Sequence, residues 1–272
     1  MAAEIRWIDT HAHLTDVAFD DDREAVIERA RAAGVRKIIV NAWDLASIDG
    51  VLEFAARVPE VYCAIGIHPS DCADYSDAVG RTIKQYAEQA DRYKIVAIGE
   101  VGMDYHYDGI DKEMQQHVFR EQIRIAQAVN LPLVVHERDA HEDALTLLLQ
   151  AEADGILRQA PGVFHCYSGS GEFAKRLIPM GWYFGFDGPL TYKNGKKARA
   201  VVEVLPRDRV LIETDSPYLA PDGYRGKRNE SAYLPLIGSE LARLWDLSLA
   251  ETAEQLWQNS HTLFPGLHDS RA

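Results

Sequence analysis

The chain has 272 residues, of which 47% are hydrophobic and 26% are charged, a composition typical of soluble globular proteins rather than of disordered or membrane-spanning ones. Its formal net charge of −13 at pH 7 argues against a broad basic face that cradles duplex nucleic acid, because such binding neutralises many phosphates. A nucleic-acid end that enters a pocket stays compatible with this charge.

The first apolar run begins at residue 5, which leaves no room for a signal peptide, and no stretch approaches the roughly 20 apolar residues of a membrane helix. Three cysteines, Cys63, Cys72 and Cys166, lack zinc-finger spacing and are expected to be reduced thiols. We therefore expect a cytoplasmic protein with no membrane contact. We also expect a monomer without an obligate protein partner.

Short apolar runs alternate with longer amphipathic segments along the whole chain. The predicted strands are residues 5–8, 37–40, 61–67, 95–98, 131–135, 162–164, 182–186 and 210–212. The predicted helices are residues 22–33, 46–57, 79–89, 112–129, 140–151, 172–179, 198–205 and 231–244. Strict alternation of this kind predicts parallel strands joined by helical crossovers.

These units predict an α/β fold, namely a single-domain (β/α)8 TIM barrel over residues 1–267 with a frayed C-terminal tail at residues 268–272. The alternative is an open doubly wound sheet. Such sheets carry a Gly-rich phosphate loop after the first strand, whereas here two histidines follow it. The barrel is therefore favoured.

Unusual polar residues fall at the carboxyl ends of the predicted strands, which form one rim of a barrel and carry its active site. The first strand leads into Asp9-Thr10-His11-Ala12-His13. Because side chains alternate along extended backbone, His11 and His13 point the same way and can grip one ion. A His-x-His pair is often only a surface feature, but its place at a strand end favours the metal site.

Four more candidate ligands follow other strands. Glu100 lies between Gly99 and Val101 after the fourth strand, and His136, His165 and Asp215 follow the fifth, sixth and eighth. Each alone is a common rim residue. The eighth strand lies beside the first in a closed barrel, so Asp215 is expected near His11 and His13.

Together these residues predict a two-metal site with His11, His13 and Asp215 on one ion, His136 and His165 on the other, and Glu100 as the bridge. Nitrogen and carboxylate ligands suit Zn2+, Mn2+ or Fe2+ and leave Mg2+ open. Two ions roughly 3.5–4 Å apart would activate a shared water as a metal-bound hydroxide, which predicts hydrolysis. Asp215 is the expected proton acceptor.

At these residues the chain resembles the TatD-family metal-dependent deoxyribonucleases, a branch of the amidohydrolase-like barrel enzymes. The matching motifs run from end to end: Asp9-Thr10-His11-Ala12-His13, Gly66-Ile67-His68-Pro69, Gly99-Glu100-Val101-Gly102-Met103-Asp104-Tyr105, His136, His165-Cys166-Tyr167-Ser168-Gly169, Glu213-Thr214-Asp215-Ser216-Pro217-Tyr218 and Arg228-Asn229. The resemblance implies a 3′–5′ exonuclease on single-stranded DNA, and the six candidate ligands match the family's ligand positions.

The chain departs from the family pattern at two places near the expected substrate site. Ser231 stands where the family commonly has proline after Arg-Asn-Glu, and the loop after the seventh strand reads Phe186-Asp187-Gly188-Pro189 instead of containing Ser-Gly. Neither departure touches a candidate metal ligand. Both fall where substrate contacts are expected.

Further side chains near the rim are candidates for substrate contacts. Phosphate-binding candidates are His68, Arg138, Tyr167, Lys193, Arg225 and Arg228. Either Tyr105 or Tyr218 is expected to stack on a base. Asp9 and Glu213 are expected to orient the metal ligands without binding metal themselves.

Two other functions stay open at this point. The same ion-bound hydroxide would attack a carbonyl, so a small-molecule or aminoacyl-tRNA ester or amide is an alternative substrate. Many such hydrolases carry a carbamylated lysine at the bridging position, where this chain has Glu100, and this favours the nuclease. A non-catalytic metal-binding barrel is the third hypothesis, although all six candidate ligands are present.

Overall fold

The structure is a computed structural model that describes residues 5–268. Its eight strands are β1 (Trp7–Ala12), β2 (Val35–Asn41), β3 (Val61–Ile65), β4 (Ile95–Asp104), β5 (Leu133–Arg138), β6 (Gly162–Phe164), β7 (Tyr183–Phe186) and β8 (Val210–Ile212). They form one sheet in the order of the sequence, and every neighbouring pair is parallel. The predicted α/β barrel is thereby confirmed.

The sheet closes on itself where the segment after β8 meets the end of β1. The Asp215 N–H donates to the carbonyl of His11 at 2.9 Å, and the His13 N–H donates to that of Ser216 at 2.8 Å. Deeper in the barrel the Thr10 hydroxyl donates to the carbonyl of Ile212 at 3.0 Å. Three candidate site residues therefore belong to the seam of the barrel.

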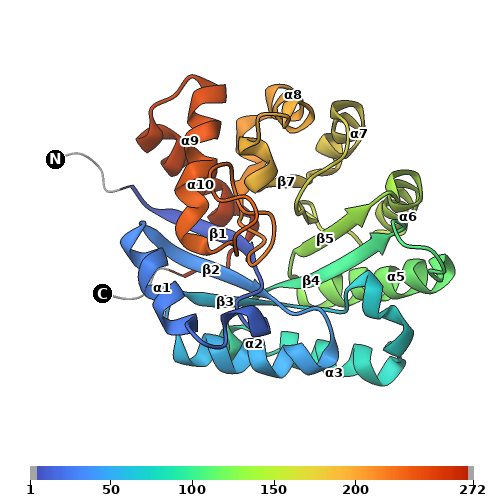
Figure 1. The fold of residues 1–272 in the computed structure, drawn as a ribbon. Helices are drawn as coiled ribbons and strands as arrows, with labels where there is room; N and C mark the ends of the chain where they lie inside the picture. Colours follow the sequence, from blue (N-terminus) through green and yellow to red (C-terminus); the bar gives the residue numbers. More distant parts are fainter. Residues whose placement is uncertain (1–4, 269–272) are drawn as a thin grey trace.

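Helices surround the strands, as Figure 1 shows. They are α1 (Arg23–Ala32), α2 (Leu45–Arg57), α3 (Asp77–Ala87), α4 (Ala90–Tyr93), α5 (Lys112–Val129), α6 (His141–Ala153), α7 (Gly171–Leu177), α8 (Lys196–Val204), α9 (Leu234–Trp245) and α10 (Leu249–Leu263). Short 3-10 turns are η1 (Val17–Phe19), η2 (Pro69–Asp74), η3 (Ile178–Met180), η4 (Gly188–Thr191), η5 (Arg207–Arg209) and η6 (Ser231–Tyr233). Both α9 and α10 pack against β1, far from them in sequence.

Local sequence sets several helix ends. Asp44 and Ser248 begin α2 and α10 with reciprocal capping boxes, in which the side chain of the third helical residue bonds back to the cap. Asn130 ends α5 in the left-handed conformation that asparagine tolerates better than most residues. These signals place the helix ends, and the apolar stripe of each helix then fixes which face covers the barrel.

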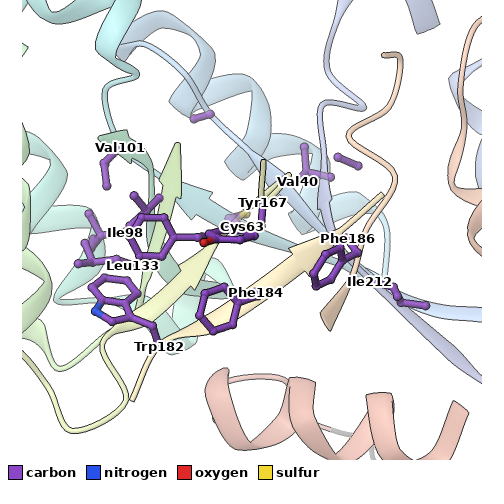
Figure 2. Close-up of a cluster of buried hydrophobic side chains, with 14 of the residues drawn as sticks. Val40, Cys63, Ile98, Val101, Leu133, Tyr167, Trp182, Phe184, Phe186 and Ile212 are labelled. Atoms are coloured by element: carbon purple, nitrogen blue, oxygen red, sulfur yellow. The ribbon is translucent and has the colours of Figure 1, made fainter. Parts of the chain in front are cut away.

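Alternation along the strands divides the buried apolar residues into two clusters. Ile38 and Val40 belong to the larger cluster, which the surrounding helices cover, whereas Ile39 between them belongs to the smaller one inside the barrel. Figure 2 shows part of the larger cluster, including Leu133, Phe184 and Ile212. The period of two in each strand thus fills both faces of the sheet.

The end of the chain closes one mouth of the barrel. Phe264 and Leu267 join the interior cluster, and Gly266 lies against Ile95 at the start of β4. This mouth faces the amino ends of the strands, so the opposite rim is left for a site. Within residues 5–268, none of the helices is both long enough and apolar enough to cross a membrane.

The structure differs from the sequence prediction at a few boundaries. The fourth strand was expected to end at residue 98 but continues to Asp104, so Glu100 lies within it. The helices α4 and α10 were not predicted, and α4 is only one turn long. In the predicted C-terminal tail, residues 269–272 lie outside the described part of the chain.

Candidate metal centre

One group of donor atoms forms around His11 and His13 at the end of β1. Their Nε2 atoms lie 3.1 Å apart, and each is 3.4 Å from Oε2 of Glu100 on β4. Asp215 Oδ1 lies 3.6 Å from Nε2 of His11 and 3.5 Å from Nε2 of His13. Residues from both sides of the barrel seam and from β4 therefore converge on one point.

A second group forms on the other oxygen of Glu100. Its Oε1 lies 2.9 Å from Nδ1 of His136 on β5 and 2.8 Å from Nε2 of His165 after β6. The two histidine nitrogens are 3.2 Å apart. His68, after β3, brings its Nε2 to 3.4 Å from the same oxygen. Glu100 thus faces one group with each carboxylate oxygen.

The first group has the dimensions of a transition-metal cage. Zn–N and Zn–O bonds of roughly 2.0–2.2 Å place neighbouring donors of a tetrahedron about 3.3–3.6 Å apart. The observed separations among His11, His13, Glu100 and Asp215 run from 3.1 to 3.6 Å. The donor set also has the mixed nitrogen and carboxylate chemistry of a catalytic metal site. The residues fit a divalent ion.

Contacts behind the ligands fix their orientation. Nε2 of His136 lies 3.1 Å from Oδ2 of Asp104, and Nδ1 of His13 lies 3.2 Å from the Asn41 carbonyl oxygen. Each partner accepts a hydrogen bond from the N–H of the outer ring nitrogen, so in the neutral ring the inner nitrogen presents its lone pair toward the centre. Sequence reasoning missed Asp104, although it stands in the Gly102-Met103-Asp104 segment that follows Glu100.

Asp9 and Glu213 connect strand ends behind the centre. Asp9 accepts hydrogen bonds from the Thr214 backbone N–H at 2.9 Å and from the Thr214 hydroxyl at 2.7 Å, which ties β1 to β8. Glu213 Oε1 accepts from the Cys166 N–H and lies 3.7 Å from Nδ1 of His165. Burial raises the pKa of Asp9 to about 6 and that of Glu213 well above its usual value.

In the metal-free protein, nearby carboxylates favour the protonated forms of His13 and His136, whereas burial lowers the pKa of His11 to about 4. Burial opposes protonation of His13, but the carboxylates of Asp215 and Glu100 outweigh it and raise its pKa to about 10. Burial likewise opposes protonation of His136, whose pKa Asp104 and Glu100 raise to about 9. Burial favours a neutral Glu100, yet the surrounding imidazoles hold its pKa well below the usual value. The centre therefore attracts positive charge.

Two cavities meet at this centre. One, of about 580 Å³, is lined by residues of the segments after β5, β6 and β7, among them Tyr167, Asp187 and Lys197. The other cavity, of about 630 Å³, has Trp43 and Tyr107 among its lining residues. Both include His136, Arg138, His165, Asp215 and Leu219. Three of the six metal-ligand candidates, His136, His165 and Asp215, thus lie between the two cavities.

The structure brings only some of the predicted substrate residues to these cavities. His68, Arg138 and Tyr167 line them. Lys193 is exposed and lines neither cavity, and the Arg225 guanidinium lies 4.3 Å from the ring centre of Tyr192, which lines the first. Half of the six predicted phosphate contacts therefore line the cavities.

Arg228 is engaged elsewhere in the structure. Its Nη1 and Nη2 donate to Oδ1 and Oδ2 of Asp22, each at 2.7 Å, and Nη1 also donates to the Ala18 carbonyl at 2.6 Å. This bidentate pair fixes the segment before α9 to the start of α1. Arg228 is thus placed as a structural contact, and neither cavity includes it.

The aromatic residues at the second cavity differ from those expected. Tyr105 donates its hydroxyl hydrogen to Asp143 at 2.9 Å and lines neither cavity. Tyr218 does line the second cavity and is 54% exposed. Tyr107, which the sequence reasoning missed, lines it too and is 60% exposed. Two exposed aromatic rings therefore flank the entrance.

Comparison with known proteins places the chain in a family. The model of the TatD-related DNase family matches residues 8–265. The chain belongs to this family. A Bacillus subtilis member, the uncharacterised metal-dependent hydrolase YabD, is 42% identical over 94% of this chain and 98% of its own length. The Cronobacter turicensis 3′–5′ ssDNA/RNA exonuclease TatD is 35% identical over 86% of this chain and 89% of its own length.

A solved TatD-family structure agrees with the fold. The Escherichia coli TatD homologue YjjV is 34% identical and superposes with a TM-score of 0.88 over 96% of this chain and 98% of its own. The family resemblance read from the motifs is thereby confirmed. This TatD-family chain is a metal-dependent hydrolase, and its His, Glu and Asp clusters are able to hold metal.

Proposed function

We propose that this TatD-family hydrolase cleaves phosphodiester bonds of single-stranded DNA from the 3′ end. The observation that carries the proposal is the Glu100 carboxylate, which faces a separate donor group with each oxygen and lies beside His136, His165 and Asp215, which line both cavities. A nucleic-acid strand bound across these residues would have space on both sides of the reacting phosphate. The exonuclease named among the relatives supports nucleic acid as the substrate.

We propose further that His11, His13 and Asp215 hold one divalent ion, that His136 and His165 hold a second, and that Glu100 bridges them. Zn2+, Mn2+ and Mg2+ are the candidates. When bound, such a pair lowers the pKa of a water molecule and offsets the charge that develops on a phosphate. All six side chains lie in the two donor groups described above.

The protein's own groups would position the phosphate and accept the proton. Asp215 ends beside the centre with its carboxylate ionised, because the neighbouring imidazoles outweigh burial and lower its pKa, so it is able to take a proton from the attacking water. Arg138 lines both cavities and would pair with a phosphate oxygen. Tyr107 and Tyr218 would stack on unpaired bases at the entrance.

His68 would act as a hydrogen-bond donor at this site. The Ser70 N–H donates to its Nδ1 at 3.1 Å, so a neutral ring carries its proton on Nε2. That Nε2–H faces Glu100 Oε1 at 3.4 Å. A protonated nitrogen donates to a substrate oxygen and does not ligate metal, which separates His68 from His136 and His165.

The test uses metal-stripped protein and a 5′-labelled single-stranded oligonucleotide, with Mg2+, Mn2+ or Zn2+ added back in turn. We expect a ladder that shortens from the 3′ end only with metal. Glu100→Ala should remove it, and Asp215→Asn should leave the fold intact and remove most turnover. Glu172→Ala is the matched control, because that glutamate is 84% exposed and pairs only with Lys175 among the described residues.

Two further substrates separate the proposal from its alternatives. A circular single strand should stay intact, because an exonuclease needs an end, and fragments of the circle would point to an endonuclease. Metal-loaded wild-type protein that leaves every oligonucleotide uncut but hydrolyses carboxylic esters or amides would contradict the proposal. It would place a carbonyl substrate at the same centre.

A further inference from the structure

A third group of potential ligands lies beside the centre and shares Asp215 with it. The thiol of Cys166 and carboxylate oxygens of Asp187 and Asp215 all lie within 4.8 Å of one another. Cys166 directly follows His165, Asp187 follows β7, and Asp215 is the residue that also faces His11 and His13. Three neighbouring strand ends thus contribute one ligand atom each.

Asp187 supplies an independent indication that this group receives a ligand. Its side chain is only 4% exposed and lines the first cavity, and its Oδ2 is buried without any hydrogen-bond partner. Buried polar atoms in native proteins nearly always have a partner, and a carboxylate oxygen without one is especially unfavourable. A cation held between Asp187 and its neighbours would supply that partner.

The surroundings of Asp187 favour a cation over an anionic or neutral ligand. Asp215 and Glu213 both lie close enough to interact electrostatically with it. Among residues 5–268, no lysine or arginine forms an ion pair with Asp187, Glu213 or Asp215. A corner that holds three carboxylates, none of them ion-paired to a described lysine or arginine, is suited to a metal ion.

We propose that Cys166, Asp187 and Asp215 bind a third divalent ion, separate from the pair on Glu100, with the Asp215 carboxylate shared between sites. The thiolate makes this site selective for Zn2+ and similar soft or borderline ions over Mg2+, which prefers oxygen ligands. Cys166 releases its thiol proton to solvent as the ion binds. We therefore expect Mg2+ to leave this site empty.

Cobalt spectroscopy tests the site without relying on turnover. A thiolate bound to Co2+ gives a charge-transfer band in the near ultraviolet, which histidine and carboxylate ligands do not give. Metal-stripped protein titrated with Co2+ should develop this band, and Cys166→Ser should abolish it. Cys72→Ser is the matched control, because Cys72 is a buried thiol near His68 that donates to the carbonyl of that residue.

Metal counting completes the test and keeps it independent of the proposed nuclease. Zinc-loaded wild-type protein should retain one more ion per chain than Asp187→Asn or Cys166→Ser after desalting. Glu100→Ala should keep the thiolate band, so loss of the Glu100 centre and loss of this site are distinguishable. Equal metal content in wild type and both variants, or Co2+-loaded wild type without the band, would overturn the proposal.

Discussion

Asp104→Asn should invert the proton arrangement of His136 and weaken the second metal position. Asp104 accepts the His106 N–H through Oδ1 at 2.9 Å and faces Nε2 of His136 through Oδ2 at 3.1 Å. In the asparagine variant the amide oxygen keeps the His106 contact, so the amide nitrogen points at His136. That nitrogen donates, and the ring must then carry its proton on Nδ1, which faces Glu100.

The size of the effect follows from the burial of the pair. The Asp104 side chain is only 5% exposed, so solvent does little to screen the contact. Residues that orient a metal-binding histidine in this way contribute about 10–100-fold in metal affinity, or about 1.4–2.7 kcal/mol. We expect a loss at the upper end of that range, because the wrong tautomer places a hydrogen where the ion needs a lone pair.

Competition with a chromophoric chelator measures this loss for Zn2+ or Mn2+. Asp104→Ala should lose less affinity than Asp104→Asn, because without a donor opposite Nε2 the ring is able to choose the tautomer that binds metal. Asp143→Asn serves as the control, since its carboxylate contacts Tyr105 outside both cavities. Wild-type affinity in Asp104→Asn, or weaker binding in the alanine variant, would refute the reasoning.

Three further predictions concern the same centre. Gly102 has a φ of +142°, and a Cβ there would lie 2.0 Å from the His136 carbonyl oxygen. Overpacking and backbone strain together should therefore make Gly102→Ala less stable, with a free energy of unfolding lower by about 2–5 kcal/mol. Urea denaturation measures this difference. The pKa values of about 10 for His13 and about 9 for His136 lie above the roughly 6.5 of unfolded histidine. Protonation of these two histidines therefore stabilises the metal-free protein fully below about pH 6.5, and this stabilisation is lost as the pH rises through 9–10. The thermal midpoint of the metal-free protein should fall over that range. A midpoint that rises there would contradict the raised pKa values. Removal of the metal by a chelator should lower the thermal midpoint by about 5–11 °C for each ion, relative to protein in free metal at 100 times its Kd. Calorimetry with and without the chelator measures this shift.

The fold and the metal-ligand candidates could be predicted because both depend on short-range patterns. Apolar runs of three to seven residues placed each strand, and the residue directly after the run, such as His136 or His165, falls on the active rim of any parallel barrel. Strand closure then brings Asp215 to His11 without any knowledge of side-chain packing. The alternation rule correctly paired His11 with His13.

The substrate residues could not be predicted equally well, because their positions depend on partners distant in sequence. Arg228 pairs with Asp22, which is 206 positions away in the sequence, and no local sequence pattern indicates that contact. Tyr105 and Tyr107 have similar sequence surroundings, yet only Tyr107 reaches the cavity, because the hydroxyl of Tyr105 is held by Asp143 on α6. At Asp187, where the chain departs from the family motif, only the folded structure brings the carboxylate beside Cys166 and Asp215.

The acidity of the chain determines how it would hold a polyanion. Among residues 5–268, Arg138 and Lys197 are the lysine and arginine side chains that line the two cavities. Single-stranded nucleic acid releases counterions with a slope of about −0.7 per phosphate neutralised, so these two side chains account for a slope of only about −1.4 in a plot of log affinity against log salt. A broad basic face with 6–10 contacts would give about −4 to −7.

The remaining affinity must then come from bound ions and aromatic stacking, neither of which behaves like a row of lysines. Metal-loaded Asp215→Asn, which should bind without turning over, allows the slope to be measured by fluorescence anisotropy with a labelled single strand. We expect a shallow salt dependence and binding that Tyr107→Ala weakens. A slope steeper than about −4 would mean that basic side chains outside the two cavities contact the strand, and the binding surface would have to extend beyond them.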